Sequence, residues 1–452
     1  MRYTRLTLLL LALTAPLAAL ANPFEHQLAN GLRVIVKEDR RAPTAAHMVW
    51  YRAGSMDETN GTTGVAHVLE HLMFKGTPTA GPGEFNRRVA AAGGRDNAFT
   101  SRDYTAYFQQ IPKQKLEEMM QLEADRMRHL TLDPKEFAQE IKVVMEERRL
   151  RTDDQPQSML FEQMSGVAFQ SHPYRVPVIG WMNDLESMTV QDAREWYERW
   201  YVPNNAYVVI VGDVDHAQVF KQAEHHYGSL KPRALPARKP QNEPVQAGIR
   251  RLTVKAPAEL PVVLMSYKVP VIRDVEKDVD PYALEMLSAI LDGHEAARFS
   301  KHLIREQRLA VAAGSGYDST SRGPGMFYLQ GSPSEGKTPA ELEAGFRAEL
   351  AHIQKDGVAD DELARAKAQL VASQIYKLDS MFAQAMEIGQ LESVGISHKL
   401  DRRMIEKLQA VSAEQVKAVA QKYFRDDLLT VAELDPQPLP QAPRPRSAAP
   451  RH

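Results

Sequence analysis

Near the middle of the 452-residue chain, a proline-rich stretch interrupts the pattern of helices and strands. Between Lys231 and Gln246 the sequence is rich in proline, lysine, arginine and glutamine, and it has no hydrophobic periodicity. A chain of this length is also too long for one compact core. We therefore predict two domains, residues 22–231 and 249–434, joined by a linker over residues 232–248.

Both predicted domains mix helix and strand signals in a loosely repeated order, which indicates an α+β fold with a duplicated architecture. In the first domain, strands are predicted over residues 32–36, 46–51 and 206–211, a strand pair over 97–111, and helices over 65–74, 84–92, 114–151 (interrupted near 133–134) and 192–200. In the second, a strand is predicted over 262–269, helices over 282–291 and 296–306, further strands up to residue 329, then long helices and a strand near 428–433.

The first residues have the pattern of an export signal. Arg2 and Arg5 precede an apolar run over residues 6–20, and Ala19-Leu20-Ala21 supplies a small-x-small cleavage site. We predict a cleaved signal peptide over residues 1–21 and a periplasmic location. The apolar run is shorter than the roughly 20 residues that a membrane span needs, so no stable span is expected.

Composition narrows the class of protein. Hydrophobic residues make up 43% and charged residues 25%, as in an ordinary globular protein, and the formal net charge is −2. Such a charge gives no reason to expect nucleic acid as a partner. There is no cysteine, so a metal site must use histidine and carboxylates. Residues 435–452, rich in proline, alanine and arginine, are expected to be a disordered tail.

The predicted helix over residues 65–74 contains His-x-x-Glu-His. His67, Glu70 and His71 are spaced i, i+3 and i+4, so their side chains share one helix face. Two imidazoles one turn apart can bind one Zn²⁺ at about 2.0–2.1 Å. The carboxylate of Glu70 can accept a proton from a water molecule at the metal. This order of residues is the inverzincin pattern, the reverse of His-Glu-x-x-His.

A catalytic zinc ion also needs a third protein ligand and one open position. The acidic helix over residues 137–148 offers Glu140, Glu146 and Glu147. Glu140 and Glu147 are seven residues apart and share a face, whereas Glu146 points elsewhere. Glutamates on helices usually face solvent, so spacing alone leaves the third ligand open.

Together these residues resemble a known family. The segment from Gly64 to Thr77 closely resembles the zinc motif of the pitrilysin/insulinase peptidases, in particular the half-length branch that includes mitochondrial processing peptidase and its bacterial relatives. The resemblance covers nearly the whole mature chain. Further matching segments are Asn30-Gly31-Leu32, Asp96-Asn97-Ala98-Phe99-Thr100, Ala124-Asp125-Arg126-Met127, His172-Pro173-Tyr174, Tyr201-Val202-Pro203-Asn204-Asn205 and Gly212-Asp213-Val214.

The resemblance implies two homologous α+β domains that face each other across a substrate chamber, each a mainly antiparallel sheet with packed helices. It implies one Zn²⁺ per chain, bound by His67, His71 and Glu147 in the N-terminal domain. Glu140 would support the site by orienting a ligand imidazole. Asn97, Ala98 and Phe99 resemble the edge strand that pairs with the substrate backbone in this family.

One segment departs from the family pattern. The C-terminal domain of the family often carries Arg-Glu-Lys-Arg-Gly-Leu-Ala-Tyr, whose arginine and tyrosine contact the substrate. Here Arg305 is retained for substrate binding, but Val311 takes the place of the tyrosine. Tyr317 is out of register and is expected to pack in the sheet. Heterodimeric members divide these features between subunits, so we expect a homologous partner that lacks the zinc motif, with a self-dimer as the alternative.

The sequence thus predicts a zinc-dependent endopeptidase that hydrolyses peptides or unfolded segments. Two alternatives are a non-catalytic peptide-binding or assembly subunit and a zinc-binding protein without hydrolysis. The intact His-x-x-Glu-His motif together with Glu147 argues against the first, since a scaffold needs none of these residues. Glu70, which metal binding alone does not require, argues against the second.

Overall fold

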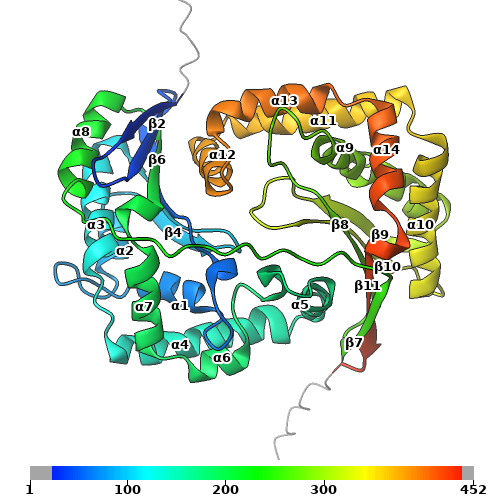
Figure 1. Ribbon diagram of the computed structural model, residues 1–452, viewed down its shortest axis with the longest axis horizontal. Coiled ribbons are helices and arrows are strands. Elements are labelled where there is room, and N and C mark those ends of the chain that lie inside the picture. Colours follow the sequence, from blue (N-terminus) through cyan, green and yellow to red (C-terminus); the bar gives the residue numbers. More distant parts are fainter. Residues whose placement is uncertain (1–22, 440–452) are drawn as a thin grey trace, which may run out of the picture.

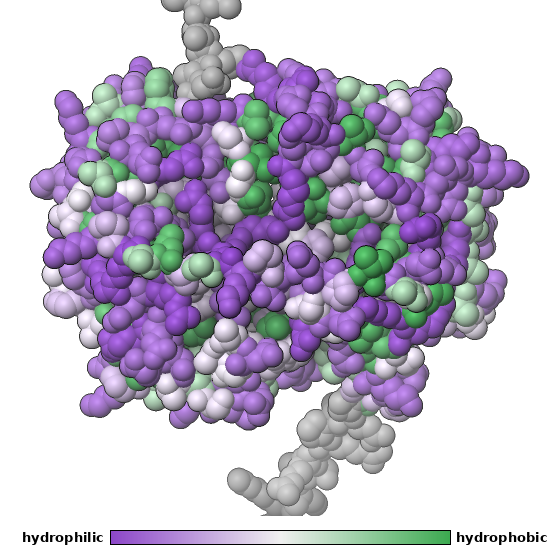
Figure 2. Space-filling model, in the orientation of Figure 1, coloured by the Kyte–Doolittle hydropathy of each residue, from purple (hydrophilic) through white to green (hydrophobic). Residues whose placement is uncertain are grey.

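The computed structural model describes residues 23–439, in which two α+β domains lie beside each other (Figure 1). The predicted signal peptide lies outside the described residues. Within residues 23–439, no helix combines the length and the apolar character that crossing a bilayer requires. Hydrophilic side chains cover most of the face shown in Figure 2, where hydrophobic side chains form small separate groups.

The N-terminal domain is built on a six-stranded sheet with the order β1-β2-β6-β3-β5-β4. All neighbouring strands are antiparallel except β2 and β6. The strands are β1 (Phe24–Gln27), β2 (Arg33–Glu38), β3 (Thr44–Tyr51), β4 (Arg95–Thr100), β5 (Thr105–Pro112) and β6 (Ala206–Gly212). The helices are α1 (Val65–Leu72), α2 (Glu84–Ala91), α3 (Leu116–His129), α4 (Pro134–Arg148), α5 (Pro156–Ala168), α6 (Met182–Ser187), α7 (Val190–Trp200) and α8 (His216–Tyr227).

The C-terminal domain is built on a five-stranded sheet with the order β7-β11-β8-β10-β9, in which only β7 and β11 are parallel. The strands are β7 (Arg250–Pro257), β8 (Val262–Val269), β9 (Ala310–Tyr317), β10 (Gly325–Pro333) and β11 (Leu429–Gln437). The helices are α9 (Asp280–Asp292), the π-helical η6 (Phe299–Glu306), α10 (Pro339–Asp356), α11 (Asp360–Lys377), α12 (Met381–Ser393), α13 (Asp401–Gln409) and α14 (Ala413–Tyr423).

The two domains repeat one architecture. Without β1, the N-terminal sheet has the order β2-β6-β3-β5-β4, which matches β7-β11-β8-β10-β9 strand for strand in chain order. The helix that follows the second of these strands is α1 in the first domain and α9 in the second, and α9 contains no histidine. The predicted α+β class with two homologous, mainly antiparallel domains is therefore confirmed.

Each domain also sends one helix to the sheet of the other. Helix α5 packs Leu160 and Met164 against the C-terminal sheet, in a buried cluster with Leu264 of β8. Helix α12 packs Ala385 and Ile388 against the N-terminal sheet, in a cluster that also includes Trp50, Tyr207 and Val209. Both faces of each sheet are thereby covered, which explains why all of β6 is buried. A cavity of about 800 Å³ lies between the domains and is lined by residues of both.

Residues 231–247 form no helix or strand and run from one domain to the other (Figure 1). Side chains along this segment bind both domains. Arg238 donates to Asp57 in the N-terminal domain at 2.6 Å. Glu243 accepts hydrogen bonds from the backbone N–H groups of residues 170–172 and from Nζ of Lys268 on β8. The connection is thus fixed by polar contacts rather than by regular structure.

Several features differ from the expectations, and helices α5, α6 and α8 were not predicted. Strands β1 and β7 were not predicted, because Phe24–Gln27 is mostly polar and Arg250–Pro257 buries only two of its side chains. The helix expected over residues 296–306 begins at Phe299. Strand β11 continues to Gln437, so the order extends past residue 434, where we expected the domain to end and the disordered tail to begin. Beyond Leu434 this strand pairs with β7 alone, in a register that ends at Pro257.

Candidate metal centre

Three side chains from two helices converge at the site. The ligand atoms of His67 and His71 on α1 and of Glu147 on α4 all lie within 4.8 Å of one another. Oε2 of Glu147 is 3.3 Å from Nε2 of His71 and 3.8 Å from Nε2 of His67. A cation placed between these atoms is within reach of all three. Two imidazoles and one carboxylate form the donor set of a catalytic zinc site with one open position, so these residues fit Zn²⁺.

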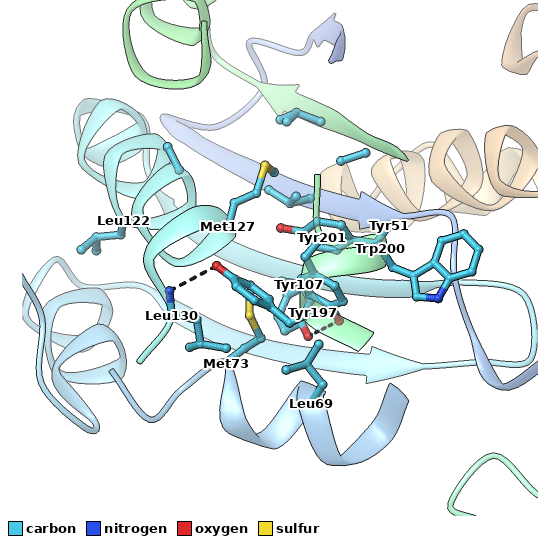
Figure 3. Packing of buried hydrophobic residues seen from close by; sticks show 14 of the residues in the cluster. Tyr51, Leu69, Met73, Tyr107, Leu122, Met127, Leu130, Tyr197, Trp200 and Tyr201 are labelled. Carbon is cyan, nitrogen blue, oxygen red and sulfur yellow. Dashed lines mark hydrogen bonds between the residues drawn. The ribbon is translucent and has the colours of Figure 1, made fainter. Parts of the chain in front are cut away.

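The opposite face of α1 anchors the helix in the core of the N-terminal domain. Leu69 of α1 and Met73, which follows it, lie in the same buried cluster as Tyr107 on β5 (Figure 3). The hydroxyl groups of Tyr107 and Tyr201 are 2.8 Å apart and form a buried hydrogen bond. Because this apolar face is buried, the face that carries His67 and His71 is directed away from the core.

The N-terminus of α1 is held by a second set of contacts. Glu58 accepts hydrogen bonds from the backbone N–H of Gly64 at 2.8 Å and of Ala66 at 2.9 Å. These N–H groups have no partner within the helix, so the carboxylate caps the first turn. Gly64 has φ of +87°, and a Cβ atom there would lie 2.5 Å from the carbonyl oxygen of Ile179. Glycine is therefore required where the chain enters the motif helix.

Two charged pairs orient the ligands. Oε2 of Glu140 lies 3.3 Å from Nδ1 of His71, and its Oε1 lies 2.6 Å from Nζ of Lys75. In the tautomer that this arrangement favours, Nδ1–H of His71 donates to Glu140, and the lone pair of Nε2 faces Glu147. Oε1 of Glu147 is bound by Arg151 at 2.7 Å, which leaves Oε2 for a metal. Glu140 and Glu147 thus contact opposite sides of the same imidazole.

Lys75 and Arg151 were not predicted as part of the site. Each lies four residues after the residue that defines the site on its helix, Lys75 after His71 and Arg151 after Glu147. For Arg151, which pairs with Glu147, this helical spacing is a signal from which it could have been found. Lys75 lies beyond the end of α1 and pairs with Glu140, so its spacing gives no such signal. Arg151 lies on η3 (Arg149–Asp153), a π-helical turn that continues α4.

The protonation state of His67 suits metal binding. Burial, together with the nearby His71 and Arg151, lowers the pKa of His67 to about 3. The imidazole is therefore neutral at pH 7, which is the form that binds a cation. Its Nδ1 atom is buried and has no hydrogen-bond partner among residues 23–439.

Glu70 lies beside the three candidate ligands without being one of them. Burial raises the pKa of the Glu70 carboxyl, and this effect outweighs the hydrogen bond from Thr100 and the nearby His71, which lower it. Oγ1 of Thr100 donates to Oε2 of Glu70 at 2.5 Å. The site therefore combines a candidate metal-binding triad with a mostly buried carboxylate that is suited to proton transfer.

A cavity of about 730 Å³ opens in front of these residues, and the predicted substrate strand borders it. Asn97, Ala98 and Phe99 of β4 line the cavity together with Glu70. Within residues 23–439, strand β4 is the last strand of its sheet and pairs only with β5. The backbone N–H of Ala98 donates to Oδ1 of Asn97 at 2.9 Å, so this group is not used in pairing with β5. The free edge of the sheet thus faces the cavity that contains the candidate metal site.

Other predicted residues lie elsewhere. Arg305 is on η6, where Nη1 donates to the carbonyl of Glu295 at 2.7 Å, and it is not among the described residues that line the metal cavity. Tyr317 packs in the C-terminal sheet as expected, since its ring stacks on Phe327 and its hydroxyl donates to the carbonyl of Pro270 at 2.6 Å. Glu146 points away from the site and pairs with an arginine on the helix surface at 3.0 Å.

A second group of potential ligands, Glu38, Asp215 and His216, has a structural explanation. Oε1 of Glu38 accepts hydrogen bonds from both the backbone N–H and Nδ1 of His216. Asp215 caps the N-terminus of α8 through the N–H of Gln218. These bonds already use the groups that a cation would need.

Comparison with known proteins agrees with this geometry. Residues 33–180 match the family model "Insulinase (Peptidase family M16)", and residues 187–370 match the model "Peptidase M16 inactive domain". The chain is 32% identical over 444 residues to the zinc protease PqqE of Helicobacter pylori. The matched region covers 95% of this chain and 97% of that protein.

Two solved structures extend the comparison. A crystal structure of a protease from Helicobacter pylori has a TM-score of 0.87 and 31% identity, over 92% of this chain and 100% of that chain. The periplasmic protease PqqL from Escherichia coli shares the fold, with a TM-score of 0.78 and 17% identity, over 92% of this chain but 48% of that one. These matches confirm the resemblance seen in the sequence: the chain belongs to the insulinase family, peptidase family M16, as a half-length member.

Proposed function

We propose that this chain is a zinc-dependent endopeptidase that hydrolyses peptides or unfolded segments. The observation that carries the proposal is the convergence of His67, His71 and Glu147 beside the mostly buried carboxylate of Glu70. A non-catalytic scaffold needs none of these four groups in this arrangement. The relative from Helicobacter pylori, named a zinc protease, supports the same function.

In the proposed mechanism, His67, His71 and Glu147 would hold one Zn²⁺. When bound, the ion supplies Lewis acidity, which polarises the scissile carbonyl and lowers the pKa of the attacking water. Glu70 accepts a proton from that water and later delivers it to the nitrogen of the leaving amine. Burial supports this role, because a carboxyl whose pKa is raised binds the transferred proton more readily than an ordinary glutamate does.

The substrate class follows from the free edge of β4. An extended peptide that adds to Asn97, Ala98 and Phe99 would form backbone hydrogen bonds like those of a sheet. The peptide would replace the Asn97 side chain as the partner of the Ala98 N–H. Only a chain segment that is free to extend can bind in this way, so we propose peptides and unfolded segments as substrates rather than folded domains.

We further propose that a homologous partner without the zinc motif completes the substrate site. Arg305 and Val311 hold the positions of the family's substrate-contacting arginine and tyrosine, and neither lines the metal cavity among the described residues. A partner subunit would supply that pair. If the purified chain alone cleaves peptides at full rate, with no increase on addition of such a partner, the heterodimer proposal is wrong and a self-sufficient chain or self-dimer replaces it.

We propose that the protein acts in the periplasm after cleavage of residues 1–21, on the strength of the export pattern at the start of the sequence. Fractionation followed by N-terminal sequencing tests this proposal. The expected result is a periplasmic protein that begins at Asn22. Recovery with Met1 in place contradicts it.

The function is tested by metal analysis of the purified chain together with a quenched fluorescent peptide of unstructured sequence. We expect about one zinc ion per chain, cleavage that a chelator abolishes, and recovery on addition of Zn²⁺. Glu147→Gln should lose the metal. Glu146→Gln, which alters an exposed glutamate of the same helix, is the matched control and should keep both metal and activity.

Two outcomes contradict the proposed function. A chain that binds zinc but cleaves no peptide, with or without a homologous partner, is a zinc-binding protein without hydrolysis. A chain that binds no zinc and still binds peptide is a non-catalytic assembly or peptide-binding subunit.

A further inference from the structure

A single hydrogen bond joins the proposed base to the strand that borders the substrate cavity. Thr100 is the last residue of β4, and its hydroxyl donates to Oε2 of Glu70 on α1 at 2.5 Å. Thirty residues separate the two in the sequence. Within residues 23–439, this is the only side-chain hydrogen bond that Glu70 forms. Both residues line the same cavity as the metal-binding triad.

The carboxylate of Glu70 depends on such a contact for its orientation. A glutamate side chain has several rotatable bonds, whereas a group that transfers a proton must be held within about 0.5 Å of its productive position. Thr100 is well suited to hold it, because a β-branched side chain is stiff at χ1. Its backbone is fixed opposite Thr105 of β5, whose own hydroxyl donates to the carbonyl of Ala53 at 3.0 Å. With Oε2 engaged by Thr100, Oε1 remains available for the attacking water.

We propose that Thr100 is a positioning residue of the proposed reaction, which orients Glu70 and links the base to the peptide-binding edge. Asn97, Ala98 and Phe99 lie in the three positions before Thr100 on the same strand. A peptide that pairs with this edge binds the strand that ends in Thr100, and Thr100 in turn holds the carboxylate. This inference rests on the proposed endopeptidase function, since it assigns no second activity to the site.

A purely structural role for Thr100 leads to a different expectation. Strand β4 is already held along its whole length by β5, from Arg95 opposite Gln110 to Thr100 opposite Thr105. Valine has nearly the shape of threonine and favours strands, so Thr100→Val should preserve this pairing. The substitution removes only the hydroxyl that Glu70 accepts.

The test compares Thr100→Val with Thr100→Ser in peptide hydrolysis by the zinc-loaded protein, together with its partner if one is required. For Thr100→Val we expect kcat to fall about 10- to 100-fold, with KM within about twofold of wild type, because a positioning contact acts on the chemical step. Thr100→Ser restores the hydroxyl and should recover kcat to within about threefold. Zinc content should be unchanged in both, since within residues 23–439 the Thr100 hydroxyl bonds to Glu70 and to none of the three proposed ligands. A crystal structure of Thr100→Val should show Glu70 in more than one orientation.

Thr44→Val is the matched control. Thr44 begins β3 in the same sheet, is exposed, and lies outside the metal cavity. This variant should keep wild-type kcat and KM.

The inference is overturned if Thr100→Val keeps wild-type kcat, if it loses zinc or folded structure, or if Thr100→Ser fails to recover. These results are distinct from failure of the proposed function. If the proposed function is wrong, the wild-type protein itself cleaves no peptide. If the wild type is active and Thr100→Val has the same kcat, only the role of Thr100 is contradicted.

Discussion

Arg322 of the C-terminal domain forms a two-pronged ion pair with Asp57 of the N-terminal domain. Nη1 lies 2.9 Å from Oδ2, and Nη2 lies 3.2 Å from Oδ1. The backbone N–H of Arg322 donates to Oδ2 of Asp103, and Nη1 also donates to the carbonyl of Asp103. The loop between β9 and β10 is thereby fixed to the N-terminal domain by charged groups that are mostly buried.

Replacement of Arg322 should weaken the protein as a whole. Arg322→Met removes the two-pronged partner of the Asp57 carboxylate, which keeps only its bond to Arg238, and it removes a donor to the Asp103 carbonyl. We expect the free energy of unfolding to fall by about 2–4 kcal/mol, as measured by chemical denaturation. Arg365→Met is the control, because Arg365 pairs with Asp361 on the surface of α11, and its loss should cost less than about 0.5 kcal/mol. Equal effects in the two variants would contradict the importance of the interdomain pair.

Gly389 should be required where α12 packs on the opposite domain. A Cβ atom at Gly389 would lie 2.1 Å from the ring of Trp50, and the hydroxyl of Tyr207 donates to the Gly389 carbonyl at 2.7 Å. Gly389→Ala should therefore displace α12 and lower the free energy of unfolding by about 1–3 kcal/mol. The matched control is Gly166→Ala in α5, the other exchanged helix, where a Cβ atom meets nothing within 4 Å. That variant should be neutral or up to about 1 kcal/mol more stable in the same denaturation experiment. If Gly389→Ala leaves the free energy of unfolding unchanged, close packing of α12 on the N-terminal sheet does not contribute to stability at this position.

Glu392 should make stability depend on pH in the acid range. Burial opposes ionisation of this carboxyl, but hydrogen bonds from His398 and Arg33 outweigh burial and lower its pKa to about 2, from an ordinary value of 4.5. The ionised Glu392 therefore stabilises the folded protein above pH 4.5, and this contribution to the free energy of unfolding is lost as the pH falls toward 2. Glu392→Gln should lower the free energy of unfolding by about 2 kcal/mol at pH 7, and this difference should shrink steadily below about pH 5. Urea denaturation of wild type and Glu392→Gln over a pH series measures this difference in the free energy of unfolding. A difference that does not change with pH would contradict the lowered pKa of Glu392.

Glu140 should affect zinc affinity without being a ligand. Glu140→Gln leaves the Nζ of Lys75 without its carboxylate and weakens the acceptor of His71 Nδ1–H. We expect zinc affinity to fall about 10-fold, in competition with a chelator of known affinity. Glu146→Gln should bind zinc like wild type. Unchanged affinity in Glu140→Gln would mean that His71 is oriented by other contacts.

Local spacing predicts part of the site well and leaves another part open. His67, Glu70 and His71 lie within one helical turn, so their shared face follows from helix geometry alone. The same geometry cannot separate Glu140 from Glu147, which share a face, and only the family resemblance placed Glu147 at the metal. In the structure the two carboxylates contact different nitrogen atoms of His71, a distinction that depends on how α4 crosses α1.

Contacts between segments that are distant in the chain could not be predicted from the sequence. Thr100 at the end of a strand donates a hydrogen bond to Glu70 on a helix, and the sequence around either residue does not indicate this contact. The apolar faces of α5 and α12 predict buried helices, but periodicity does not say which sheet a helix covers. The packing of α5 and α12 on the sheet of the opposite domain was therefore found only in the structure. The repeated order of strands and helices, in contrast, was visible in the sequence.

The proposed function depends most directly on Glu70, and zinc content measured alongside turnover for Glu70→Gln tests it. Glutamine has nearly the same shape as glutamate but cannot accept the proton from the attacking water. This variant should keep about one zinc ion per chain while kcat falls by about 10²- to 10⁴-fold. A Glu70→Gln variant that retains its zinc and cleaves the peptide at the wild-type rate would contradict the proposed function.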